Sequence, residues 1–145
     1  QNERTVFSLD NERKIAPIIC YESVYGEYVT EYVRKGANIL AIITNDGWWS
    51  ESQGYKQHLS YARIRAIETR RNILRSANTG SSAVINFNGE ILKKLDYGKR
   101  GFINATAETI NKLTFYVKYG DFIFRFSLFF FIIILLFSLS KKKIN

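Results

Sequence analysis

The chain has 145 residues, which is enough for one domain or for part of a larger one. Hydrophobic residues make up 46% of the chain, which argues against disorder. The single cysteine excludes an intrachain disulfide, and with only one histidine beside it a zinc site is disfavoured. The net charge is +8, but the basic residues form no zinc-finger or RNA-recognition pattern, so we expect no nucleic-acid partner. The chain opens on polar residues and contains no methionine, which predicts the C-terminal portion of a longer protein.

Strands and helices are predicted to alternate from residue 14 onward. Residues 14–20 form a short apolar run typical of a buried strand. Residues 24–35 are predicted as a helix that Gly36 ends. A second apolar strand is predicted over residues 38–44, and the Asn, Asp, Gly and Ser content of residues 45–54 indicates a loop.

The next segments extend the same pattern. Residues 58–71 are predicted as an amphipathic helix, on which we expect a structural ion-pair network of Arg65, Glu68, Arg71 and Arg75. Two strands follow, and Asn88–Gly89 is a hairpin signal that leads into a third. This order indicates an α/β layer fold with some antiparallel pairing.

A long apolar segment follows the predicted α/β part. Residues 122–139 are interrupted only by Arg125 and two serines, and as a helix they would be about 27 Å long, close to the thickness of the hydrocarbon core. A core helix would keep a polar stripe, so the segment predicts a membrane-spanning helix, with Arg125 near enough to its start to reach the interface. The lysines at 141–143 predict a cytoplasmic C-terminus, with residues 1–119 on the opposite side.

Cys20, the single cysteine, lies where the first predicted strand meets the following helix. A nucleophile at this position projects into a cleft, and unpaired N–H groups at the helix start favour the reactive thiolate. The alternative is that Cys20 is simply a small, buried hydrophobic residue with no chemical role. A cysteine-protease arrangement would need His58, whereas Glu22 is the nearby carboxylate that would serve instead. The residues alone leave this choice open.

Three motifs in order carry a family resemblance. The sequence "ICYE" after an apolar strand is followed by "GANILAIITNDGWW" and then by "HLSYARIRAIETRRNILRSANTGSSAVIN". Together they resemble the carbon–nitrogen hydrolase (nitrilase) superfamily, and within it the family of bacterial apolipoprotein N-acyltransferases. The resemblance implies an α/β fold, a nitrilase-like α-β-β-α sandwich, of which residues 1–119 form the C-terminal part. Residues 120–145 would then be a transmembrane helix with a basic cytoplasmic tail, in a bacterial inner membrane with the nitrilase-like domain in the periplasm.

The resemblance also implies a catalytic site. The superfamily uses a Glu–Lys–Cys triad, in which Cys20 matches the nucleophile; the glutamate base and the lysine lie upstream in the family, and nothing here matches them. We therefore expect the chain alone to be inactive. Tyr21 adjoins the nucleophile, where its backbone N–H is a candidate oxyanion donor. Glu22 is expected to shape the acyl pocket or orient the lysine, with an arginine partner as the alternative.

Two further pairs of residues match the family pattern. Asn45 and Asp46 end the second predicted strand, at the edge where α/β sites form, although ordinary turn chemistry would also explain them. Trp48 and Trp49 follow in a polar loop, where they are poor candidates for a core. In this family that loop faces the membrane, where aromatic rings suit the arrival of lipid.

The reaction implied by the resemblance is acyl transfer in two steps through a thioester on Cys20. The acyl donor would be a membrane phospholipid and the acceptor the N-terminal amine of a diacylglyceryl-modified lipoprotein, and both partners lie in the lipid bilayer. No metal and no organic cofactor is expected. Two alternatives remain from the sequence: a membrane-tethered nitrilase or amidase acting on a small soluble amide or nitrile, and a non-catalytic membrane-anchored module.

Overall fold

A single mixed β-sheet forms the centre of the α/β part. The computed structural model describes residues 3–142, and of residues 141 and 142 it describes only the backbone. The sheet has six strands in the order of the chain: β1 (Phe7–Ser8), β2 (Lys14–Ile19), β3 (Ile39–Thr44), β4 (Asn72–Ala77), β5 (Ser82–Ile85) and β6 (Ile91–Leu95). Strands β2, β3 and β4 are parallel to one another, and the remaining neighbours pair antiparallel. The predicted strands and the hairpin after Asn88–Gly89 are thereby confirmed.

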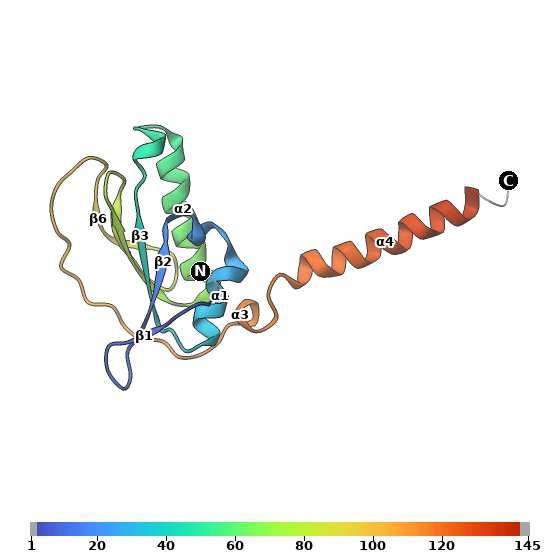
Figure 1. Cartoon of the computed structure of the whole chain (residues 1–145), viewed down its shortest axis with the longest axis horizontal. Coiled ribbons are helices and arrows are strands. Elements are labelled where there is room, and N and C mark those ends of the chain that lie inside the picture. The colour runs from blue at the N-terminus through green and yellow to red at the C-terminus, as the bar shows by residue number, and fades with distance from the viewer. Residues whose placement is uncertain (1–2, 143–145) are drawn as a thin grey trace.

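The helices lie mainly on one face of this sheet (Figure 1). They are η1 (Cys20–Val24), α1 (Gly26–Arg34), η2 (Gly47–Trp49), α2 (Gln53–Thr69), α3 (Phe115–Tyr119) and α4 (Phe122–Lys142). The starts of two helices differ by two or more residues from those predicted. The helix expected from residue 24 begins at Gly26, because the 3₁₀ turn η1 precedes it, and α2 begins five residues before His58, because the Ser52 hydroxyl accepts a hydrogen bond from the Gly54 N–H at 3.2 Å and caps it.

The core lies between the sheet and helices α1 and α2. Leu40 and Ile42 of β3 are completely buried against this helical layer. Ile43 points to the opposite face and is 52% exposed, because successive residues of a strand alternate between faces. The segment after β6 passes along that opposite face and returns to α3 (Figure 1). The described chain therefore provides one sheet and one helical layer of the expected α/β arrangement.

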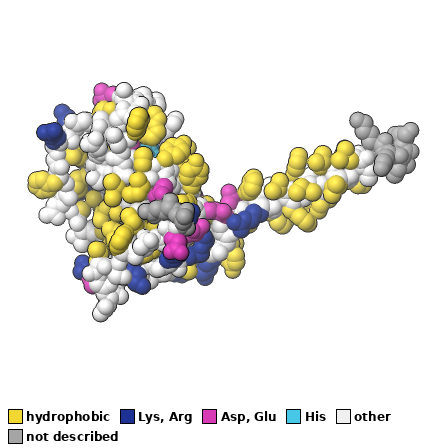
Figure 2. Space-filling view, in the orientation of Figure 1, with side chains coloured by type: hydrophobic (Ala, Val, Ile, Leu, Met, Phe, Trp, Pro, Cys, Tyr) yellow, Lys and Arg dark blue, Asp and Glu magenta, His cyan; other side chains and the backbone are white. Residues whose placement is uncertain are grey.

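Helix α4 extends away from the α/β part, and its surface is hydrophobic along its length (Figure 2). Residues Phe122–Ser140 are long and apolar enough to cross a membrane, and none of this stretch is buried in the protein, as a soluble core helix would be. Arg125 donates to Glu27 of α1 at 2.6 Å, so the start of α4 is attached to the helix that follows Cys20. Of the three C-terminal lysines, Lys143 lies outside the described residues.

Candidate active site

Cys20 occupies a strained turn at the end of β2. Its φ angle is +52°, a left-handed value that costs a non-glycine residue about 1–3 kcal/mol. Two side chains of η1 hold the turn: Glu22 Oε2 accepts a hydrogen bond from the Ile19 N–H at 2.8 Å, and the Ser23 hydroxyl donates to the Cys20 carbonyl at 2.8 Å. The turn follows the last residue of β2 and so lies at the carboxyl edge of the parallel strands, where sites of α/β proteins form.

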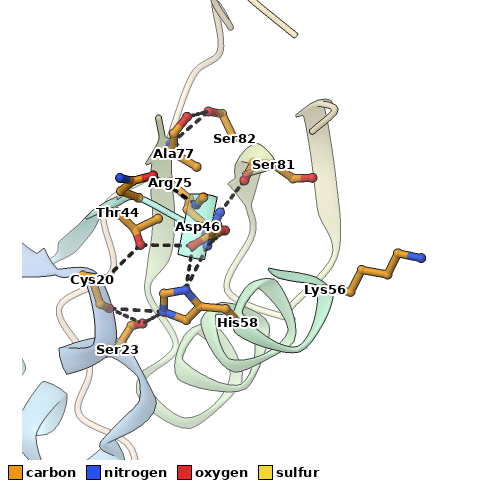
Figure 3. Close-up of polar contacts among 12 residues, drawn as sticks. Cys20, Ser23, Thr44, Asp46, Lys56, His58, Arg75, Ala77, Ser81 and Ser82 are labelled. Carbon is orange, nitrogen blue, oxygen red and sulfur yellow. Dashed lines mark hydrogen bonds and ion pairs between the residues drawn. The ribbon is translucent and has the colours of Figure 1, made fainter. Parts of the chain in front are cut away.

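A buried histidine lies beside this turn (Figure 3). His58 of α2 is only 2% exposed, and its Nε2 lies 3.2 Å from the Cys20 carbonyl oxygen and 3.0 Å from Ser23 Oγ. Its Nδ1 lies 2.9 Å from Asp46 Oδ1, which as a carboxylate oxygen accepts the hydrogen bond. The imidazole is therefore directed to the backbone of Cys20, and the cysteine-protease pairing of His58 with the sulfur is not the arrangement that forms.

Ser23, His58 and Asp46 follow each other in the order of a serine-hydrolase triad. Ser23 and Asp46 are both completely buried, so no substrate reaches the serine hydroxyl. The Ser23 hydroxyl also donates to the Cys20 carbonyl. We interpret the three residues as a support for the turn at Cys20 and not as a second nucleophilic site.

A buried ion pair completes the network. Arg75 of β4 donates from Nη2 to Asp46 Oδ2 at 2.7 Å, both side chains are fully buried, and a second nitrogen of Arg75 donates to the Ser81 carbonyl. Burial by itself would raise the pKa of Asp46, but the hydrogen bonds from His58 and Arg75 outweigh burial and lower it. Asp46 is therefore an ionised carboxylate that holds α2 and β4 together beneath the site.

Thr44 is the residue that connects this network to the sulfur. Its Oγ1 lies 3.3 Å from Cys20 Sγ and 3.1 Å from Asp46 Oδ1. The parallel register pairs Ile19 with Ile43, so the residues that follow them, Cys20 at the start of η1 and Thr44 at the end of β3, meet at the sheet edge. The sequence alone indicated neither Thr44 nor Ser23, because the register of parallel strands is set by tertiary pairing and has no local signal.

The residues predicted around Cys20 are divided between the surface and the buried network. Tyr21 is 51% exposed, and its ring centroid lies 6.2 Å from that of His58. Glu22 bonds to the Ile19 N–H and to the hydroxyl of Tyr28, which are the partners described for it in place of an arginine. Its described role is thus to hold the turn.

The loop after β3 separates adjacent residues in the same way. Asn45 is exposed and accepts a hydrogen bond from the Gly47 N–H at 3.0 Å, which is ordinary turn chemistry, whereas Asp46 is fully buried. Trp48 is 83% exposed. Trp49 is partly buried and packs edge-on against His58, with ring centroids 5.3 Å apart. The two tryptophans therefore have different surroundings.

The predicted ion-pair network on α2 is correct only in part. Arg65 and Glu68 do form an ion pair, at 2.9 Å. Arg71 lies beyond the end of α2 and donates to backbone carbonyls, including that of Ala37, and burial lowers its pKa to about 10. Arg75 lies on β4 and pairs with Asp46. The spacing of these arginines resembled a helix because α2 and β4 are separated by only two residues.

Known proteins share both this fold and much of this sequence. The model of the carbon–nitrogen hydrolase family matches residues 1–109. The chain is 39% identical over 109 residues to an apolipoprotein N-acyltransferase from Rhizobium etli, covering 75% of this chain and 20% of the relative. It is 42% identical over 105 residues to that of Agrobacterium fabrum, covering 72% and 20%.

Among solved structures, the carbon–nitrogen hydrolase from Helicobacter pylori superposes with a TM-score of 0.55 at 19% identity, over 62% of this chain and 39% of that one. The chain spans about a fifth of the length of the curated relatives that it matches. The family match extends over all six strands and the turn at Cys20. This chain belongs to the carbon–nitrogen hydrolase family.

Proposed function

We propose that the protein is an apolipoprotein N-acyltransferase, which moves a fatty acyl chain from a phospholipid to the N-terminal amine of a diacylglyceryl-modified lipoprotein. The observation that carries the proposal is the strained turn at Cys20, which presents a thiol at the carboxyl edge of the sheet. The similarity of the chain to relatives of that name and the unburied apolar helix α4 favour a membrane acyltransferase over an enzyme that acts on soluble substrates.

In the first step, the Cys20 thiolate attacks the carbonyl carbon of the sn-1 ester. The negative charge passes to the carbonyl oxygen, for which the Tyr21 N–H at the start of η1 is a candidate donor. The C–O bond then breaks, the lysophospholipid leaves as an alkoxide that takes up a proton, and a thioester remains on Cys20. The glutamate base and the lysine of the family have no assigned residue in this chain.

In the second step, the α-amine of the lipoprotein attacks the thioester carbon. The C–S bond breaks, the amine gives up a proton, and the product is an amide with the thiolate of Cys20 restored. The thioester makes this step favourable, because an ester by itself is a slow acyl donor to an amine and a thioester is a reactive one. Glu22 and Ser23 keep the sulfur in place through both steps, since they bond to the backbone on either side of it.

The location of both substrates agrees with the proposed role of α4. The helix has 21 residues and is about 31 Å long, which matches the hydrocarbon thickness of a bilayer. We propose that it spans the bacterial inner membrane with residues 120–145 ending in the cytoplasm, so that residues 1–119 lie in the periplasm. The Arg125–Glu27 ion pair then lies at the membrane surface and attaches α4 to the helix next to the turn at Cys20.

The test of the proposed function is the covalent intermediate. The protein at its natural length, in detergent or membranes, is incubated with phospholipid alone, and the peptide that contains Cys20 is analysed by mass spectrometry. We expect a mass increase of one fatty acyl group, which disappears when a diacylglyceryl-modified lipopeptide is added. A phospholipid with an ether in place of the sn-1 ester is the matched control and should leave Cys20 unmodified. An unmodified Cys20 after incubation with the ester lipid would contradict the proposal.

The tryptophan pair provides a second prediction. Trp48→Ala should change the melting temperature little, because the side chain is 83% exposed, but it should slow acylation of Cys20 by removing apolar surface that guides the lipid chain. Trp49→Ala should lower stability by roughly 1–3 kcal/mol, less than for a fully buried tryptophan, because the ring packs on His58. Melting curves and acylation rates with long-chain and short-chain phospholipids measure both effects. The lipid-guiding role of Trp48 is wrong if Trp48→Ala slows the two donors equally or not at all.

A further inference from the structure

We propose that Thr44 is a catalytic residue whose hydroxyl donates a hydrogen bond to the Cys20 thiolate. The inference rests on the proposed role of Cys20 as nucleophile and adds a group that acts directly on the reacting atom. Thr44 Oγ1 lies 3.3 Å from Cys20 Sγ, within hydrogen-bond distance for sulfur. In Figure 3 the threonine side chain lies between the sulfur and Asp46, and it is 6% exposed, so little water competes for it.

The hydroxyl has one hydrogen and two acceptors within reach. Besides Cys20 Sγ, Asp46 Oδ1 lies 3.1 Å from Thr44 Oγ1. When Cys20 is a neutral thiol, its S–H donates to Thr44, and Thr44 donates to the ionised Asp46. When Cys20 is a thiolate, the sulfur has no hydrogen to give, and a rotation about the C–O bond of Thr44 directs its hydrogen to the sulfur. Both acceptors are then charged, but the Asp46 carboxylate already accepts from His58 and Arg75, whereas the thiolate would otherwise lack this donor, so the rotation favours the thiolate.

Asp46 tolerates the loss of this hydrogen bond because its other partners remain. Oδ1 keeps the bond from His58 Nδ1 at 2.9 Å, and Oδ2 keeps the bond from Arg75 at 2.7 Å. Arg75 also neutralises the charge of Asp46, which would otherwise repel a thiolate on the far side of Thr44. The Asp46 carboxylate thus positions the Thr44 hydroxyl, but it does not depend on the hydrogen of that hydroxyl for its own hydrogen bonds.

The other charged and titratable groups near Cys20 are engaged with different atoms. His58 is directed to the Cys20 carbonyl oxygen, and Glu22 to the Ile19 N–H and the Tyr28 hydroxyl. Tyr21 follows in η1, with its ring tilted relative to that of His58 and the two centroids 6.2 Å apart. Within the part of the chain that the structure describes, Thr44 is therefore the polar side chain that contacts the sulfur itself.

The same hydrogen bond serves both steps of acyl transfer. It stabilises the thiolate before attack on the ester, weakens when the sulfur becomes part of the neutral thioester, and forms again as the C–S bond breaks and the sulfur leaves with the electron pair. No proton is transferred by Thr44 at any point. The hydroxyl hydrogen returns to Asp46 while the thioester is present.

The experiment measures the reactivity of Cys20 without any lipid. The rate of alkylation of Cys20 by iodoacetamide, followed by mass spectrometry of the Cys20 peptide between pH 6 and pH 10, reports the thiolate in the protein at its natural length. We expect Thr44→Val to slow alkylation at neutral pH by about ten-fold or more and to displace the profile to higher pH, because a hydrogen bond to a charged group is lost. Thr44→Ser keeps the hydroxyl and should remain close to the wild type.

Thr69→Val is the matched control, because Thr69 is also fully buried and its hydroxyl bonds to a helix carbonyl at 2.6 Å, away from Cys20. Its alkylation profile should be that of the wild type. If Thr44→Val does not fold, Thr44→Ala replaces it, with melting curves to show that the turn is intact. A wild-type profile in a folded variant that lacks the hydroxyl, or a Thr44→Ser profile as slow as that of Thr44→Val, would overturn the proposal. Because alkylation needs no phospholipid, failure here is distinct from a missing acyl adduct.

Discussion

Replacing Cys20 with alanine is expected to abolish acyl transfer, with a loss of at least about a thousand-fold, because no thioester forms without the sulfur. Folding should be preserved. Cys20 is only partly buried, and the bonds from Glu22 and Ser23 that hold the turn involve backbone atoms that alanine retains. The measurement is N-acylation of a model lipopeptide by the protein in membranes, together with its melting temperature.

Two further replacements make this test sharper. Cys20→Ser keeps the size and the φ angle of +52° but provides a weaker nucleophile, so it should be nearly as inactive as Cys20→Ala. Cys20→Gly should also be inactive but melt no lower than Cys20→Ala, because glycine adopts a positive φ without strain. N-acylation that persists in Cys20→Ala would rule out Cys20 as the nucleophile. A glycine variant that melts well below the alanine variant would argue against the strained turn.

Replacing Asp46 with asparagine is expected to destabilise the fold by about 3–5 kcal/mol, because it leaves the guanidinium of Arg75 buried without a counter-charge. The asparagine also weakens the hydrogen bond from His58, which lies against the Cys20 carbonyl. We therefore expect a large fall in the melting temperature and a loss of acylation in the fraction that remains folded. Thermal unfolding in detergent measures the first effect, and the mass spectrum of the Cys20 peptide measures the second.

Glu51→Gln is the matched control for Asp46→Asn, since it makes the same change from carboxylate to amide at an exposed position in the same loop. It should leave the melting temperature unchanged. A second variant, Asp46→Asn with Arg75→Met, should recover part of the lost stability, because it removes the uncompensated charge. If Asp46→Asn is as stable as Glu51→Gln, the Asp46–Arg75 pair does not hold the fold as we infer.

The same pair predicts a dependence of stability on pH. Burial alone would raise the pKa of Asp46, but the hydrogen bonds from His58 and Arg75 lower it below the ordinary value of 3.8. A lowered pKa in the folded state means that the stabilisation is complete above the unfolded value and is lost as the pH falls through the folded one. Acid should therefore destabilise the wild type below about pH 4, and this part of the acid dependence should be absent from Asp46→Asn.

The sequence by itself determined β2 to β6, α1, α2 and α4, because each has a local signal, whereas the short elements β1, η1, η2 and α3 were not predicted. Apolar runs marked β2 and β3, and Gly36, with a φ angle of +97°, marked the end of α1. Helix α4 was evident from the length and composition of its apolar segment. Cys20 was recognisable as a candidate nucleophile because it follows a buried strand, and the ordered motifs around it indicated the family that the match to residues 1–109 shows.

Only the tertiary structure decided which polar side chains meet below the sulfur. Thr44, His58 and Arg75 belong to three different elements, and each is 24 or more residues from Cys20 in the chain. Arg75 was expected on a helix and lies on β4. Asp46 and Asn45 are neighbours in sequence, yet one is fully buried and the other exposed. Such contacts depend on the register of parallel strands and on the packing of α2 against the sheet, which are non-local and leave no periodic pattern in the sequence.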